Sequence, residues 1–328
     1  MNVIRYIQAL SELWKDIQTQ KRFNKVFLAP YIETLEKKYD GHFHKGQREK
    51  ILNYYGLFIP AVLAASYKRL YKTILSDDER KRVTLFGILT PVGDDLFDID
   101  QLDIAAIHTI TYTPHLYQDS HFTAHVACEI QDFLLHHVPN VAAYTLAAKH
   151  VFDIQIETLK QLDANISEEE IAHITFCKGG YSVIIYHEVM HAADDALRAA
   201  LFDVGSLMQL ANDLFDLHKD IPDGIQTLPA RCTNFSALKK TYYNLSLQCN
   251  KKIRDLDFDK KEKEIFLIKM QFIITRGLVA LDHFIQIENA NGGALRMDTL
   301  SRKALITDMQ KPSNIFKWLR YLIKMSAN

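Results

Sequence analysis

Residues that break helices are scarce along this chain, with only 12 glycines and 8 prolines among 328 residues. Apolar residues recur at helical spacing over long segments, whereas alternating strand patterns are almost absent. We therefore predict an all-α fold, with helix breaks at Pro91 and Gly93 and at the Gly179–Gly180 pair. Around these sites we predict helices over residues 78–90, 94–110, 168–178, 181–201 and 203–220.

The composition limits the classes of function. A formal net charge of -1 argues against a nucleic-acid partner, and 48% apolar residues are enough for a large core. The longest apolar run, Gly56–Ala65, is too short to span a bilayer, and the N-terminus lacks the features of a signal peptide. We expect a single domain over residues 1–328, four reduced cysteines, a cytoplasmic location and no stable membrane insertion, and we leave a homodimer open.

An acidic cluster interrupts an otherwise apolar stretch at "PVGDDLFDID". On a helix, Asp94, Asp95 and Asp98 have the spacing i, i+1 and i+4 and share one face. Three carboxylates on one face are suited to a hard divalent cation such as Mg²⁺. The alternative is that Pro91 and Gly93 end one helix, so that the first two aspartates begin the next one and are favoured by its dipole.

A second cluster lies in "QLANDLFDLHKD". Asn212, Asp216 and Asp220 recur every four residues and therefore share one helical face, with Asp213 beside them and Lys219 next to the last. Two such polar ladders on largely buried helices can face each other across a helical bundle. Together they predict a site for Mg²⁺ ions around a diphosphate.

These two motifs resemble those of the class I isoprenoid synthase superfamily. "DDLFD" is similar to its DDxxD motif, and "NDLFDLHKD" is similar to the second metal motif of the terpene cyclases. Asp216 stands where that motif usually has Ser or Thr, and Asp220 where it usually has Glu. Gln209 and the loop "DIPDGIQTLP" are similar to the squalene and phytoene synthase branch. The resemblance covers roughly residues 45–220.

The resemblance implies an antiparallel helical bundle with a central apolar cavity and a linear prenyl diphosphate as substrate. It implies that three Mg²⁺ bridge Asp94, Asp95 and Asp98 to Asn212, Asp216 and Asp220, and that Asp94, Asp95 and Asn212 are essential to catalysis. The metal ions would stabilise the charge that develops as the C–O bond ionises, and aromatic faces would stabilise the carbocation.

The resemblance also implies basic groups that bind the diphosphate. Lys178, at the Gly179–Gly180 pair, is one candidate, although a lysine at that place can equally neutralise a helix C-terminus. Lys219 matches the lysine of the cyclase motif. Arg320 and Tyr321 resemble a late Arg-Tyr pair of the cyclases, although an ordinary amphipathic helix explains that dipeptide as well.

Terpene cyclisation and prenyl transfer remain as alternatives on the same fold. After the first motif no Lys or Arg occurs before Lys149, whereas chain-elongating synthases place a basic pair there. "HKGQREK", with Lys45, Arg48 and Lys50, only loosely resembles their early basic motif. This balance favours a terpene synthase, a lyase that uses one diphosphate per turnover, over a chain-elongating or squalene-type prenyltransferase.

A competing motif, "HEVMH", matches the zinc-peptidase pattern HExxH at His187, Glu188 and His191. On a helix the two histidines would share a face and could bind Zn²⁺, with the glutamate as general base. The longer pattern with a third histidine is absent, because Leu197 stands at that position. We therefore expect these histidines to pack in the core or line a pocket, with a peptidase as the remote alternative.

Overall fold

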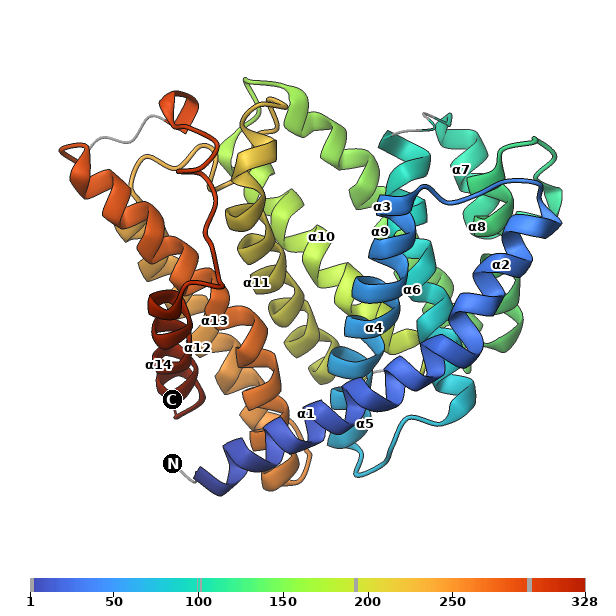
Figure 1. The fold of residues 1–328 in the computed structure, drawn as a ribbon, viewed down its shortest axis with the longest axis horizontal. Coiled ribbons are helices and arrows are strands. Elements are labelled where there is room, and N and C mark those ends of the chain that lie inside the picture. The colour runs from blue at the N-terminus through green and yellow to red at the C-terminus, as the bar shows by residue number, and fades with distance from the viewer. Residues whose placement is uncertain (1–2, 99, 101, 192–193, 294–296, 328) are drawn as a thin grey trace. The chain divides into compact units, whose positions relative to one another are not determined.

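The computed structural model describes residues 3–98, 100, 102–191, 194–293 and 297–327, without the side chains of residues 3, 98, 298 and 327. Every regular element in these ranges is a helix, which confirms the predicted all-α class (Figure 1). Within the same ranges, no helix is both long and apolar enough to cross a membrane. The four cysteines are free thiols, as predicted. The antiparallel bundle with a central cavity stays a prediction.

The helices fall into two compact units, which are described separately. The N-terminal unit comprises Ile4–Lys149 and Ile185–Ala193. The C-terminal unit comprises His150–Ile184 and Asp194–Asn328, together with the first three residues. Two of the boundaries fall within the helices α9 (Val141–Glu157) and α10 (Glu168–Glu188). The prediction of a single domain concerns independent folding and stays a prediction.

The N-terminal unit is built from α-helices with short π-helical and 3₁₀ segments between them. In chain order its elements are α1 (Val3–Phe23), η1 (Asn24–Leu28), α2 (Ala29–Lys38), α3 (Lys45–Glu49), η2 (Lys50–Tyr55), α4 (Gly56–Phe58), η3 (Ile59–Ala64), α5 (Ala65–Leu70), α6 (Asp77–Asp98), α7 (Ile104–Tyr112), η4 (Pro114–Leu116) and α8 (Phe122–His137). The segments η1, η2 and η3 are π-helical.

A buried polar network fixes α6 against α1 and α4. The Gln20 side-chain amide donates to the Gly56 carbonyl oxygen (2.9 Å) and to Thr84 Oγ1 (3.0 Å). Its oxygen accepts from Arg80 Nη1 at 2.7 Å. Because buried polar groups stabilise a fold only when they are paired, this network selects one packing arrangement of the three helices. It thereby positions α6, which carries the first acidic motif.

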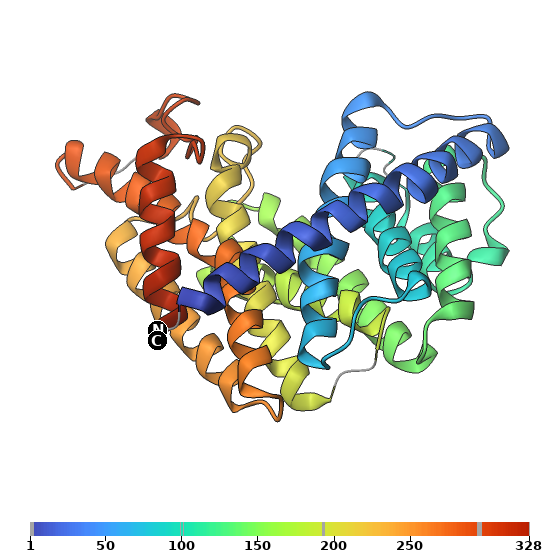
Figure 2. The ribbon, with the colours of Figure 1, turned by 60° about the horizontal axis from the view of Figure 1, so that its bottom comes forward.

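The C-terminal unit contains the longest helices. It takes α9 from His150 onward and α10 as far as Ile184. Its other elements are η5 (Thr158–Leu162), α11 (Asp195–Asp220), α12 (Phe235–Asp255), α13 (Lys260–Ala290), η6 (Met297–Thr299) and α14 (Pro312–Ala327). Helix α13 packs against α11, α12 and α14 (Figure 2). The buried Tyr242 hydroxyl donates to the carbonyl oxygens of Ile274 (2.7 Å) and Leu207 (3.2 Å), and so joins α12 to α13 and α11.

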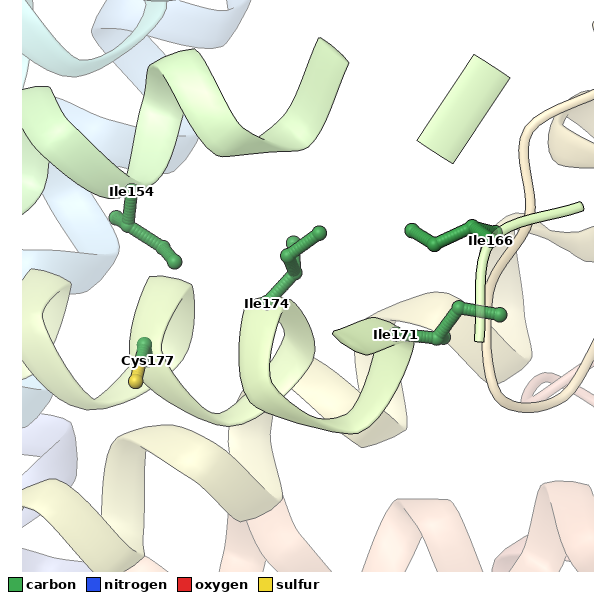
Figure 3. Packing of buried hydrophobic residues seen from close by; sticks show 5 residues of the cluster. All are labelled: Ile154, Ile166, Ile171, Ile174 and Cys177. Atoms are coloured by element: carbon green, nitrogen blue, oxygen red, sulfur yellow. The ribbon is translucent and has the colours of Figure 1, made fainter. Parts of the chain in front are cut away.

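An apolar cluster holds α10 against the end of α9. Figure 3 shows Ile154 of α9 pointing toward Cys177 and Ile174 of α10, with Ile166 and Ile171 next to them. All five are buried, and Ile171 is completely so. Helix α10 begins with a capping box, in which Ser167 Oγ accepts from the Glu170 backbone N–H (3.2 Å) and the glutamate carboxylate accepts from the Ser167 backbone N–H. Capping and burial together explain why this segment is a stable helix.

The predicted break at Pro91 and Gly93 is wrong, because α6 continues through both residues to Asp98. Val92 and Leu96 are buried on the turns around the proline. Their burial outweighs the one backbone hydrogen bond that a proline removes. The alternative in which Asp94 begins a new helix is therefore also wrong. The next helix, α7, begins at Ile104, where the Asp103 carboxylate caps the Ala106 N–H.

The predicted break at Gly179–Gly180 is wrong as well, because α10 continues through both glycines to Glu188. A Cβ atom built on Gly179 would lie 2.1 Å from the carbonyl oxygen of Gly205 on α11, and the reverse contact is equally short. Only residues without side chains allow two helix backbones to pass this closely. The glycines thus serve the crossing of α10 and α11, and α10 ends later, at Glu188, before α11 begins at its Asp194 cap.

Candidate acidic sites at two helix ends

The first acidic motif occupies the last turn of α6. Asp94 and Asp95 are half-buried there, and the backbone closes the helix with a bond from the Asp100 N–H to the Asp95 carbonyl oxygen (2.9 Å). Asp98 is the final helical residue, and its side chain lies outside the described part of the chain. The C-terminus of a helix carries negative partial charge, and no basic residue lies in this last turn of α6. The helix end therefore disfavours the ionised form of these carboxylates, and positive charge from outside α6 is needed to stabilise that form.

The segment around α3 supplies part of that compensation to Asp95. Burial raises the pKa of the Asp95 carboxyl, while the nearby Lys50 ammonium and a hydrogen bond from Gln47 Nε2 oppose the rise. His44 also lies close enough to favour the ionised form. Apart from the loose basic motif "HKGQREK", no pattern in the sequence indicated these contacts. Arg48 of that motif points elsewhere, because its guanidinium pairs with Glu36 at 2.7 Å.

The second acidic motif occupies the C-terminal part of α11. The Asn212 side-chain amide donates to Asp216 Oδ2 at 3.0 Å, which places the two side chains on one face as predicted. Lys219 Nζ lies 2.5 Å from Asp216 Oδ1. Burial and the neighbouring carboxylates of Asp213 and Asp216 together raise the pKa of Asp220 to about 7. Each of these carboxylates raises it by more than Lys219 lowers it. Negative charge therefore exceeds positive charge on this face.

Asp213 is a member of this group whose role the sequence did not indicate. It is only 6% exposed and accepts hydrogen bonds from Gln209 Nε2 (2.8 Å) and Thr175 Oγ1 (3.1 Å). Burial raises its pKa to about 6, although both hydrogen bonds and the nearby Lys178 ammonium oppose the shift. Asp213 thus links the α11 motif to α10, and Lys178 lies close enough to it to affect its pKa. The role of Lys178 in binding diphosphate stays a prediction.

The predicted Arg320–Tyr321 pair lies on α14. The Tyr321 hydroxyl donates to Asp282 Oδ2 of α13 at 2.9 Å, and Lys239 Nζ lies 5.3 Å from the centre of its ring. Arg320 is exposed. Among the described contacts of these two residues none reaches the acidic face of α11, and their role in binding diphosphate stays a prediction.

The HExxH residues lie in the N-terminal unit at the end of α10. His187 and Glu188 are buried, as expected for core residues, but α10 ends at Glu188 and His191 lies in the turn that follows. Tyr71 occupies the space beside both histidines: its hydroxyl lies 3.3 Å from His187 Nε2, and its ring centre lies 5.0 Å from that of His191. The regular helix therefore ends before His191, although the centres of the two imidazole rings lie 6.1 Å apart, and the zinc peptidase stays a remote alternative.

The donor atoms of the two acidic motifs fit a hard cation. Carboxylate and amide oxygens are the ligands that Mg²⁺ prefers, and it is typically held by one or two carboxylates plus oxygens of a bound phosphate and water. No three described His, Cys, Asp or Glu side chains stand close enough to form a complete metal site by themselves. Each motif could therefore supply only part of a coordination shell, which a substrate diphosphate would have to complete.

Comparison with known proteins adds no assignment. No model of a known protein family matches the chain, and no curated protein matches it.

Proposed function

We propose that the chain is a Mg²⁺-dependent class I isoprenoid synthase that ionises a linear prenyl diphosphate and releases diphosphate, as a terpene synthase does. The observation that carries the proposal is the acidic face of α11. Asn212, Asp216 and Asp220 lie along the C-terminal part of α11, and burial and the neighbouring carboxylates raise the pKa of Asp220 to about 7. A bound divalent cation removes this unfavourable charge.

The chain's own residues would divide the work between holding metal and holding diphosphate. Asp94, Asp95 and Asp98 of α6, and Asn212, Asp216 and Asp220 of α11, would hold the metal ions. Bound Mg²⁺ supplies positive charge to the diphosphate oxygens as the C–O bond breaks. Lys178 is held near Asp213, and Lys219 is paired with Asp216. Both ammonium groups would bind diphosphate oxygens and shift toward them once metal neutralises the aspartates.

One observation favours a prenyltransferase as the second candidate. Burial raises the pKa of Asp95, and Lys50 and His44 lie close enough to oppose this rise, so basic groups flank the first acidic motif. A second diphosphate substrate needs cationic groups of this kind, and they come from the "HKGQREK" segment that resembles the early basic motif of chain-elongating enzymes. Lys50→Ala would therefore reduce prenyl transfer, but it would leave the ionisation of a single substrate largely unchanged.

The test is incubation of the purified protein with geranyl, farnesyl and geranylgeranyl diphosphates in Mg²⁺, with diphosphate release and organic products measured together. A terpene hydrocarbon or alcohol supports the synthase. A longer prenyl diphosphate that forms only when isopentenyl diphosphate is added supports the transferase. Absence of diphosphate release from every substrate, with and without isopentenyl diphosphate, would refute both.

Paired variants separate ligand loss from misfolding. Asp95→Asn and Asp216→Asn should each lower kcat/KM at least about 100-fold, because a group that stabilises transition-state charge is lost. The matched controls are Asp78→Asn, an exposed residue at the other end of α6, and Asp203→Asn, half a turn out of phase with Asn212 on α11. Both controls should keep activity within about twofold. Equal losses in variants and controls would show that the assigned ligands are wrong.

A further inference from the structure

The outer face of α1 separates apolar and cationic side chains along its length. Ile7, Leu10 and Trp14 are 62%, 47% and 64% exposed and follow one another at helical spacing. The same stripe continues with Lys21 and then Lys25 of η1, which are both exposed. At 1.5 Å per residue, the stripe from Ile7 to Lys25 is about 27 Å long. Figure 2 shows α1 as the long dark-blue helix.

The cationic half of this stripe is hollowed. A hollow of about 670 Å³ is lined by Trp14 and by the cations Lys15, Lys21, Arg22 and Lys25, with two uncharged polar residues and no acid. None of these four cations takes part in an ion pair with a described residue.

The acids of α1 face the opposite way. Glu12 pairs with Arg69 at 3.3 Å. Burial lowers the pKa of the Arg80 guanidinium, and Asp16 lies close enough to oppose this fall. The outward surface of α1 therefore carries cationic, apolar and uncharged polar side chains, and both acids of the helix point away from it.

We propose that this face of α1 docks on the surface of an anionic phospholipid membrane, without spanning it. An amphipathic helix of this kind lies in the interface, with apolar side chains among the acyl chains and cations at the lipid phosphates. Trp14 stands at the junction of the two halves, and tryptophan prefers the level of the lipid headgroups. Ile7 and Leu10 enter the apolar layer, and Lys15, Lys21, Arg22 and Lys25 bind headgroup phosphates. The inference rests on α1 alone and is independent of the function proposed above.

Binding is measured by sedimentation with vesicles of phosphatidylcholine alone, or with one third phosphatidylglycerol. The full chain should bind the anionic vesicles, bind neutral vesicles far more weakly, and be released by high salt. Each cation near an anionic surface contributes about fivefold, so Lys21→Glu, Arg22→Glu and Lys25→Glu together should weaken binding at least about 100-fold. The control variant reverses Lys240, Lys251 and Lys260, three exposed lysines of the C-terminal unit, and has the same net charge. It should bind as the unmodified protein does.

A second pair of variants tests the apolar half. Trp14→Ser should weaken binding about tenfold, whereas Phe316→Ser, which removes an aromatic ring 70% exposed on α14, should not. Fluorescence gives an independent measure, because Trp14 and Trp318 are the chain's two tryptophans. Brominated acyl chains should quench the unmodified protein but not the Trp14→Phe variant.

Three results would overturn the inference. The first is equal binding by the two charge-reversed proteins. The second is a loss of binding in Phe316→Ser that matches the loss in Trp14→Ser. The third is a dimer in solution that Leu10→Glu converts to a monomer, because a second copy of the chain would then cover this face.

Discussion

Replacing Asp213 by asparagine should stabilise the metal-free protein above neutral pH. Burial raises the pKa of this carboxyl from 3.8 to about 6, so the folded protein favours its protonated form. Its contribution to stability is therefore fully present below about pH 4 and is lost as the pH rises through about 6. A change in pKa of this size corresponds to about 3 kcal/mol of unfolding free energy.

Asparagine has the same shape and never ionises, and its amide can still accept from Thr175 and pair with Gln209. The difference in unfolding free energy between Asp213→Asn and the unmodified protein should be close to zero at pH 4. It should rise to about 2–3 kcal/mol in favour of the variant at pH 8. Urea unfolding followed by circular dichroism, in EDTA and at constant ionic strength, measures it at each pH.

The control is Asp195→Asn at the other end of α11, where the carboxylate is fully exposed. At pH 8 it should change the unfolding free energy far less than Asp213→Asn does, because an exposed carboxylate has lost little solvation. A difference for Asp213→Asn that is flat across this range, or that falls as the pH rises, would refute the reasoning from burial.

Two further predictions concern packing in the C-terminal unit and use the same denaturation assay. Gly205→Ala should lower the unfolding free energy by about 1–3 kcal/mol or more, because its new methyl group would meet the Gly179 carbonyl, whereas Gly93→Ala, in open space on α6, should be neutral or slightly stabilising. Ile171→Ala should lower the unfolding free energy by about 2–5 kcal/mol, because the side chain is completely buried. Ile74→Ala, at a position 87% exposed, should change it little. Equal effects within either pair of variants would contradict the packing described.

The helical class was predictable because it follows from properties summed along the chain. Few glycines and prolines, long apolar periodicities and local caps such as Ser167 with Glu170 all act within one helix. The helix ends in the middle of the chain were not predictable in this way. Pro91 continues a helix because Val92 and Leu96 are buried, and burial depends on other helices.

The site was predictable only as far as one helix determines it. The spacing of Asn212 and Asp216 places them on one face of α11, and their hydrogen bond confirms this. By contrast, the contacts of Asp95 with Gln47 and of Asp213 with Thr175 join residues far apart in the sequence. The start of α11 was indicated locally, because an aspartate is a common N-cap residue. The Asp194 carboxylate accepts from the Leu197 backbone N–H at 2.7 Å.

The crossing at Gly179 and Gly205 also sets the alignment of α10 along α11. With the two backbones in contact, sliding either helix by one residue would drive a side chain into the opposite main chain. Such a slip would also turn Asp213 by about 100° around the axis of α11 and carry it away from Thr175. The two glycines therefore fix which polar groups meet one to two helical turns away.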